Sequence, residues 1–468
     1  MSLLSLPSDV WKGSLFPLLS AACMTKFDTA ACDRNLRPHV LQSLVGTRVS
    51  LECADNVQVL AITWLEKRKM FVENVSISGN RKGWTALLKN HQLTVFKHLE
   101  LELLHVQSKG DMSKKLRPIA EHIGSDSLLS LSINGNLRSG FVDERTVVAL
   151  LSRQRNLRRF AIEDIDTVTD NVLVRLASYC PLLEDLSIAF CWNVVLDNDA
   201  GSQLFSSCPL LRKFRFARQP YHPQTCFDAI IHYCSSLEEL DFYNCWNMVT
   251  DETIMPILER CSNLRVLQLG STAVTKKGFA HISRLCSRLT QLTVPMRDED
   301  PSIPDGFRLL SNSLTTFCGA LHPNTAQLSA VHWGKVMRKL NLWETLVSDA
   351  LLVSIARHCG NLEELIVADG LGSVTDTSMR AFASQTPFLK LLQIEGGRSV
   401  TDAGVLALSS GCVQLTRLIL AKSTQLTDAG LLPLIEKCTM LESVEVEATA
   451  CCTVAHRIII AYSSNRYY

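Results

Sequence analysis

A repeated pattern of about 26 residues constrains the fold of this chain more than any other feature. In one copy, Cys234 is followed by apolar residues three, six and eight positions later, by Cys245, and by the pair Thr250-Asp251. Clear copies of the pattern begin at Cys180, Cys261, Cys286, Cys359, Thr386, Cys412 and Cys438. Substituted or weaker copies begin at Lys69, Leu93, Ser125, Gln154, Cys208, Ser311 and Gly334. The sequence therefore contains about 15 copies of one structural unit.

Each copy is predicted to form one short strand and one helix. Apolar residues at the sixth and eighth positions predict a strand that buries one face and turns its fifth, seventh and ninth positions outward. Thr427-Asp428 precedes a stretch whose apolar residues have helical spacing, and its side-chain oxygens are expected to cap that helix. One unit cannot bury both of its apolar faces, so neighbouring units must stack. We therefore predict a solenoid with a parallel sheet on its concave side and helices on its convex side.

The spacing of the cysteines and leucines resembles the cysteine-containing class of leucine-rich repeats. The pattern C-x-x-L-x-x-L-x-L-x-x-C, followed by an apolar residue and Thr-Asp, covers roughly 370 of the 468 residues. It is similar to the repeats of F-box receptor proteins and of the related antagonist of mitotic exit network protein, which are intracellular. The resemblance implies an α/β fold, a horseshoe-shaped leucine-rich-repeat solenoid of about 15 strand–helix repeats. We place the solenoid at residues 69–450, a connecting helical segment at 46–68 and a C-terminal cap or tail at 451–468, and we expect a loop at 295–307.

Residues 1–45 carry no repeat and resemble the start of an F-box. The F-box pattern is Leu-Pro-x-Glu-Leu followed by apolar residues at helical spacing, and Asp9 takes the acidic place in it. The resemblance implies that this helical segment docks a Skp-type adaptor of a cullin-based ubiquitin ligase, through Leu6, Pro7, Asp9, Val10, Leu15, Phe16 and Leu19. The alternative is that Leu15, Leu18, Leu19 and Phe27 cover the open end of the first repeat, because solenoid ends need covering.

Charge and cysteine content narrow the class of partner and the compartment. The chain has 47 Lys and Arg against 46 Asp and Glu, so non-specific electrostatic binding to nucleic acid or anionic lipid is not expected. We see no secretory signal and no apolar run long enough to span a membrane. The 17 cysteines are odd in number and follow the repeat, which favours reduced thiols in a cytoplasmic or nuclear protein.

Motifs that carry catalysis or bind cofactors are not found in the sequence. It has no phosphate-binding glycine loop, no nucleophile elbow and no H-E-x-x-H pair. Cys226, His232 and Cys234 are the nearest approach to a metal site, but their helical spacing does not bring them to one face, and the repeat cysteines are expected in the core. We therefore predict neither a metal nor a cofactor, and we do not expect an enzyme.

The outward positions of the predicted strands are the candidate partner-binding residues. On the concave face we single out Lys213, Arg215, Glu239, Asp241, Tyr243, Lys339, Asn341 and Trp343. Tyr243 and Trp343 are the preferred anchors, since aromatic side chains are enriched at interfaces, whereas the charged residues could instead pair with one another. Trp192 and Trp246, which follow the second cysteine of their repeats, are interpreted mainly as stacking between turns.

Two functions fit this organisation. The first is the substrate-recognition subunit of a cullin-based, SCF-type ubiquitin ligase, in which residues 1–45 hold the adaptor and the concave face holds a protein substrate. Such a receptor acts by positioning alone. The second is an interaction scaffold, or a structural subunit of a larger assembly, with no link to ubiquitin.

Overall fold

The computed structural model divides into two compact units, Met1–Leu237 and Glu238–Tyr468, which we call unit 1 and unit 2 and describe one at a time. The structure describes residues 48–53, 71–78, 97–102, 113–135, 142–220, 227–246, 248–296, 309–310, 312–321, 333–343, 347–368, 374–395, 397–421 and 423–446.

Unit 1 is built from parallel strands that pair in the order of the sequence. Its strands are β1 (Arg48–Cys53), β2 (Phe71–Ser78), β3 (His98–Glu102), β4 (Ser130–Asn134), β5 (Arg159–Glu163), β6 (Asp185–Ala189) and β7 (Lys213–Ala217). The helices between them are α6 (Ser113–His122), α7 (Glu144–Leu151), α8 (Asn171–Tyr179), α9 (Asn198–Ser207) and α10 (Asp228–Tyr233).

Unit 2 repeats the same arrangement. Its strands are β8 (Glu239–Asp241), β9 (Val266–Gln268), β10 (Gln291–Met296), β11 (Thr316–Leu321), β12 (Lys339–Trp343), β13 (Glu364–Ala368), β14 (Leu391–Glu395), β15 (Arg417–Ala421) and β16 (Ser443–Val446). Its helices are α11 (Asp251–Arg260), α12 (Lys276–Leu285), α15 (Asp349–His358), α16 (Asp376–Gln385), α17 (Asp402–Gly411) and α18 (Asp428–Lys437).

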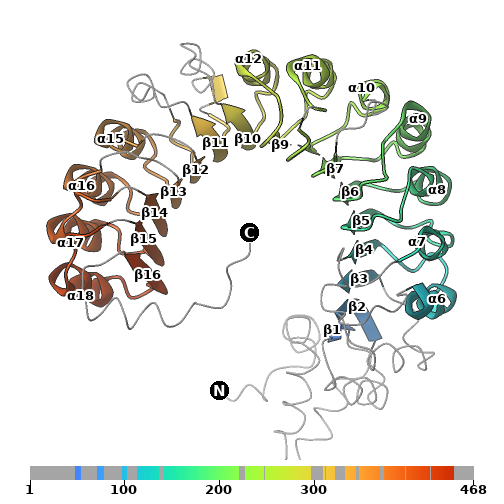
Figure 1. Ribbon diagram of the computed structural model, residues 1–468, viewed down its shortest axis with the longest axis horizontal. Coiled ribbons are helices and arrows are strands. Elements are labelled where there is room, and N and C mark those ends of the chain that lie inside the picture. Colours follow the sequence, from blue (N-terminus) through green and yellow to red (C-terminus); the bar gives the residue numbers. More distant parts are fainter. Residues whose placement is uncertain are drawn as a thin grey trace, which may run out of the picture. The chain divides into compact units, whose positions relative to one another are not determined.

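Within each unit the strands lie on the inner side and the helices on the outer side (Figure 1). Neighbouring parallel strands are about 4.8 Å apart, whereas packed helices are about 8–10 Å apart, so a stack of such repeats curves toward its strands. The core lies between the two layers. Each unit is therefore a stack of strand–helix repeats of the leucine-rich type, as the sequence predicts.

The strand positions and their orientation confirm the predicted repeat. Strands β2 to β16 fall one to one on the predicted copies. In β15, Leu418 and Leu420 are fully buried, whereas Arg417 is exposed to solvent. The same alternation of buried and outward residues recurs in β4, β5, β12 and β14. The outward residues of these strands form the surface that we call the strand face.

Two segments differ from the expectation. Residues 48–53, inside the segment expected to be a helical connection, form β1 instead, because Arg-Val-Ser-Leu-Glu-Cys alternates polar and apolar residues as strands do. Pro295 and Met296 extend β10, where we expected a loop to begin. The proline stands at the end of that strand, where losing one ladder hydrogen bond is tolerated. The other residues of 295–307, of 46–68 and of 1–45 lie outside the described residues.

The first cysteine of each repeat ends the helix and packs in the core. Cys180 and Cys412 are the C-cap residues of α8 and α17, and both are fully buried. The thiols of these repeat cysteines contact the backbone carbonyl at the equivalent position of the preceding repeat. Cys412 Sγ lies 3.6 Å from the Thr386 oxygen, and Cys438 Sγ lies 3.5 Å from the Cys412 oxygen. A small side chain with a weak donor fits this ladder, which explains why the motif uses cysteine.

Candidate functional site: the strand face

The strand face in unit 1 ends in a basic strand. Lys213 is exposed and Arg215 is partly exposed, both on β7 with their side chains on the outward positions. In the register of the sheet they stand beside Asp185 and Ser187 of β6. The sequence therefore placed these two residues correctly on the outward face.

In unit 2 the predicted residues of the first repeat lie at the start of the strand face. Glu239 and Asp241 occupy the outward positions of β8, and Tyr243 follows this strand; all three are partly exposed. Asp241 Oδ1 accepts a hydrogen bond from the Tyr243 backbone N–H at 2.8 Å. The tyrosine ring lies against Gly270 of the next repeat, where an added Cβ would be 2.7 Å from Tyr243 Cε2. Asp241 and Gly270 thus hold the aromatic residue in place.

Strand β12 carries the other predicted group. Lys339 is exposed, while Asn341 and Trp343 are partly exposed, and all three alternate with buried leucines. Lys339 Nζ forms an ion pair with Glu364 Oε1 of β13 at 2.7 Å. For this residue, the alternative that charged outward residues pair with one another is therefore confirmed. Because both side chains are at least a third exposed, this pair contributes little to stability.

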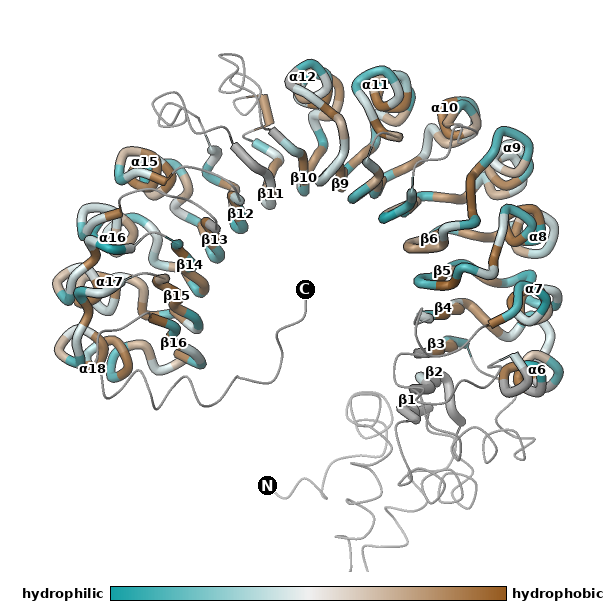
Figure 2. Tube along the Cα trace, viewed as in Figure 1, coloured by the Kyte–Doolittle hydropathy of each residue, from teal (hydrophilic) through white to brown (hydrophobic). Residues whose placement is uncertain are grey.

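Sequence reasoning missed an apolar group on the same face. Ile366 of β13, Leu391 of β14 and Ile419 of β15 occupy outward positions and are partly exposed. Figure 2 shows hydrophobic as well as hydrophilic residues on the strands of unit 2, because these aliphatic residues are added to the buried ones. The signal was available, because the rule that assigns Asn341 outward also assigns these residues outward. We weighted charged and aromatic residues and overlooked aliphatic ones.

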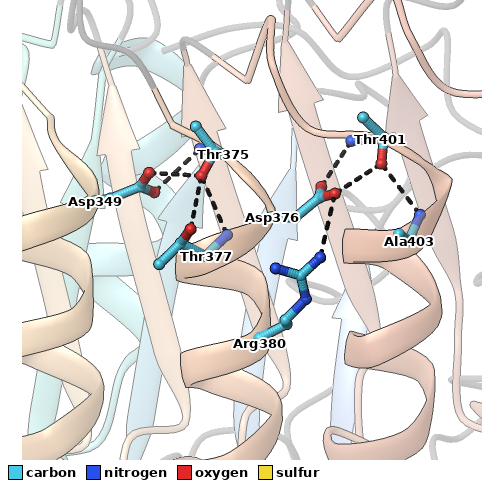
Figure 3. Close-up of polar contacts among 7 residues, drawn as sticks. All are labelled: Asp349, Thr375, Asp376, Thr377, Arg380, Thr401 and Ala403. Carbon is cyan, nitrogen blue, oxygen red and sulfur yellow. Dashed lines mark hydrogen bonds and ion pairs between the residues drawn. The ribbon is translucent and has the colours of Figure 1, made fainter.

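A ladder of Thr and Asp side chains holds the repeats at a fixed spacing. The threonines of Thr375-Asp376, Thr401-Asp402 and Thr427-Asp428 cap their own helices, as predicted: Thr401 Oγ1 accepts from the Ala403 N–H at 3.2 Å. The aspartate does something that the sequence did not reveal. Asp376 accepts from the N–H and Oγ1 of Thr401 in the next repeat, at 2.8 and 2.7 Å, and it also lies 3.8 Å from Arg380 (Figure 3).

The ladder recurs through unit 2 and has a counterpart in unit 1. Asp349 accepts from Thr375, and Asp402 accepts from Thr427, with the same pair of bonds. In unit 1, Glu144 accepts from the N–H and Oγ1 of Thr169 at 2.9 and 2.6 Å. At these joints the start of one helix is bonded to the start of the next, which fixes the spacing of the two repeats.

Glycine after the Thr-Asp pair makes room for this carboxylate. A Cβ added at Gly404 would lie 2.4 Å from Asp376 Oδ1, and one at Gly430 would lie 2.5 Å from Asp402 Oδ1. Where Ser378 replaces the glycine, its hydroxyl donates to Asp349 instead. Burial acts to raise the pKa of Asp349, but the hydrogen bonds from Ser378 and Thr375 outweigh it and hold the pKa below its ordinary value.

Burial also governs the chemistry of the described cysteines. Burial raises the pKa of the Cys180 and Cys359 thiols to about 12, so these cysteines are not nucleophiles at neutral pH. Cys318, on an outward position of β11, also has its pKa raised to about 12 by burial. Among the residues that the structure describes, no three His, Cys, Asp or Glu side chains are grouped to hold a metal ion, and Cys226 lies outside them.

Other predicted residues are placed as follows. Trp192 and Trp246 are 49% and 52% exposed, one in each unit, at the turn between strand and helix. The predicted adaptor-binding residues, from Leu6 to Leu19, lie outside the described residues. Within the described ranges, no helix has the length and apolar character needed to cross a membrane.

Comparison with known proteins adds little beyond this geometry. No known family model matches the sequence. A similar solved structure is the crystal structure of the Rad7 and Elc1 complex in yeast, with 16% sequence identity and a TM-score of 0.45. The match covers 88% of this chain and 85% of that chain. Any function must therefore be argued from the strand face itself.

Proposed function

We propose that the chain is a protein-binding receptor of the leucine-rich-repeat type, which serves as the substrate-recognition subunit of a cullin-based ubiquitin ligase. In this proposal the strand face holds the protein substrate and residues 1–45 hold a Skp-type adaptor. The chain contributes position and supplies no reactive group, because holding two molecules in a fixed geometry is itself enough to accelerate transfer between them.

The observation that carries the protein-binding part is the composition of a rigid strand face. Asn341 and Trp343 on β12, Ile366 on β13 and Ile419 on β15 are all partly exposed. Aromatic side chains such as Trp343 are enriched at protein interfaces, and the centre of an interface is more apolar than its rim. The Thr–Asp ladder fixes their spacing, so little conformational entropy is lost on binding.

The resemblance of residues 1–45 to an F-box supports the ligase part. A scaffold with no ubiquitin link is the second candidate, favoured by an observation in the same segment. The aromatic residue usual in the second half of an F-box is replaced here by Asn35 and Leu36. Both candidates use the same strand face, so the adaptor decides between them.

The test is co-purification of the adaptor and a cullin with the full chain. A Leu15→Asp/Leu19→Asp variant, kept at full length, places two charges on the proposed docking surface, and Lys12→Ala is its matched control. We expect the adaptor and cullin with the full chain and with the control, and a loss of both with the double variant. A folded full chain that recovers neither protein would exclude the ligase and leave the scaffold.

A further inference from the structure

The middle row of the strand face in unit 2 alternates between amide and aliphatic side chains. The sheet register pairs Asn341 with Ile366, Ile366 with Gln393, Gln393 with Ile419, and Ile419 with Glu445. All five residues are partly exposed, and they come one from each of β12 to β16. A row across five neighbouring strands therefore presents amide, aliphatic, amide, aliphatic and acidic groups in turn.

The aromatic residue stands beside the first end of this row. Trp343 is two positions beyond Asn341 on β12, and the register places it next to Ala368 of β13. Its indole is partly exposed on the same face. The row thus begins at a flat aromatic surface and ends at a carboxylate.

Two cations, Lys339 and Arg417, lie beside this row and contact neighbouring strands. Lys339 is paired with Glu364 at 2.7 Å, and Arg417 Nε donates to Ser443 Oγ at 3.3 Å. Glu445 has no ion-pair partner among the residues that the structure describes. Arg417 keeps its positive charge, because a serine hydroxyl does not neutralise it, and it lies in the neighbouring row with Lys339 and Leu391. Glu445 is the carboxylate of the middle row itself, so a basic group is complementary to that end of the row.

The spacing of the row favours one backbone conformation in a partner. Ile366 and Ile419 are two strands apart, about 9.6 Å, because adjacent strands are about 4.8 Å apart. A polyproline II helix has three residues per turn and a rise of about 3.1 Å, so residues three apart lie on one face about 9.3 Å from each other. In an extended strand, residues on one face repeat about every 6.8 Å, which does not match the two isoleucines.

The amides favour the same conformation. A carboxamide offers both a donor and an acceptor, and a polyproline II backbone has no internal hydrogen bonds, so its carbonyls are available to Asn341 and Gln393. A helical partner has already used its backbone groups. Aromatic side chains are the usual contacts of proline rings in such segments, which suits Trp343.

We infer that β12 to β16 bind an extended polyproline II segment of a protein partner, with apolar side chains at every third position and a basic residue toward β16. The inference rests on the proposed function, because it names the class of partner for the same strand face. The two apolar side chains contact Ile366 and Ile419, the preceding proline contacts Trp343, and the basic side chain pairs with Glu445.

The test uses the full chain and a fluorescent peptide whose binding is followed by fluorescence polarisation. The probe has two leucines three positions apart, separated and preceded by prolines, with a lysine two positions after the second leucine. One control peptide has the same composition with the leucines adjacent, and a second has glutamate in place of lysine. We expect the probe to bind about tenfold or more tightly than either control, as a misplaced apolar group or a reversed charge is expected to cost.

Variants on the strand face locate the binding. Ile366→Ser and Ile419→Ser should each weaken probe binding about tenfold, since each removes an aliphatic contact. Glu445→Lys should weaken the lysine probe and strengthen the glutamate peptide, a reversal that misfolding would not produce. Gln268→Ala, in the same row on β9, is the matched control and should leave the affinity unchanged. No binding, equal binding of the adjacent-leucine peptide, or insensitivity to the variants would each overturn the inference.

One further arm separates this inference from the function on which it rests. A photoreactive group is placed at position 341 of the otherwise unsubstituted chain and of the Ile366→Ser/Ile419→Ser double variant. The proteins that cross-link to each are then compared. One outcome is that the peptide does not bind but the double variant loses cross-links that the unsubstituted chain forms. This outcome would keep the strand face as a protein-binding site and exclude the polyproline II segment. Cross-links that do not change would exclude both.

Discussion

Leu418 and Arg417 are neighbours in β15 that face opposite sides of the sheet. Leu418 has no exposed surface, whereas Arg417 is exposed and its Nε donates a hydrogen bond to Ser443 Oγ of the next strand. Adjacent residues of this strand therefore point to the core and to the strand face in turn. This alternation means that the effect of a substitution depends on whether its position is odd or even in the strand.

Leu418→Ala should destabilise the protein by about 2–5 kcal/mol, because it leaves a cavity in a close-packed core. Arg417→Ala should change the free energy of unfolding by less than about 0.5 kcal/mol, because the side chain is exposed. Urea unfolding followed by circular dichroism measures both changes. Equal shifts of the two midpoints would show that the strand register is wrong.

Helices α16 and α17 approach so closely that their contact requires a glycine. A Cβ at Gly411 would lie 1.9 Å from the carbonyl oxygen of Ala383 and 2.6 Å from its Cα. Backbone atoms in a packed helix cannot move aside as a side-chain end can. The end of α17 is thus fitted to α16 at this one position.

Gly411→Ala is expected to destabilise the protein by about 1–3 kcal/mol, since overpacking forces the two helices apart. Gly360→Ala is the matched control, because the nearest atom to its added Cβ is the Gln385 oxygen at 3.6 Å, an ordinary contact. Thermal unfolding of the two variants gives the comparison. A Gly411→Ala variant as stable as Gly360→Ala would contradict the close approach.

The Thr–Asp ladder makes the joint between α15 and α16 sensitive to acid. The pKa of Asp349 is lowered in the folded chain by hydrogen bonds from Ser378 and Thr375, which outweigh its burial. Its contribution is therefore fully present above the unfolded pKa, about 4, and is lost as the pH falls through the lowered folded value.

When the pH falls below about 4, the Asp349→Ala variant should consequently lose less stability than the unchanged chain. It should also lower stability at neutral pH, where the bonds to Thr375 are lost. Glu436→Ala removes an exposed carboxylate of α18 and serves as the control. Unfolding midpoints measured across this pH range test the expectation, which fails if the two variants have the same pH dependence.

On the scale of the whole molecule, stability should be distributed repeat by repeat. Each strand pairs only with its neighbours in the sequence within a unit, so stability is approximately a sum over repeats and their interfaces. A destabilising substitution in one repeat should therefore increase local unfolding in the adjacent repeats first. Leu186 of β6 and Leu418 of β15, both fully buried, lie in different units and allow this to be tested.

Leu186→Ala should raise hydrogen exchange in β5 to β7 more than in β14 to β16, and Leu418→Ala should produce the opposite pattern. Exchange followed by mass spectrometry on the folded chain resolves these segments. A uniform rise over both units in either variant would mean that the chain unfolds as one cooperative body.

Much of this architecture could be predicted from the sequence because its determinants are local. The spacing of Cys412, Leu415, Leu418 and Leu420 specifies a buried strand face, and Thr427 before a helical pattern specifies where the helix begins. The same rule identifies Asn341 and Trp343 as outward residues. It also identifies Ile366 and Ile419, which only a preference for charged and aromatic groups left out.

Other features depended on residues about 25 positions apart, which meet only after the repeats are stacked in register. The bond from Asp376 to Thr401, the ion pair of Lys339 with Glu364 and the approach of Gly411 to Ala383 are all of this kind. The sequence by itself determined which side chains turn inward and which turn outward, because that follows from the period of each element. Only the tertiary structure decided which outward side chains become neighbours, because the register between repeats sets those distances.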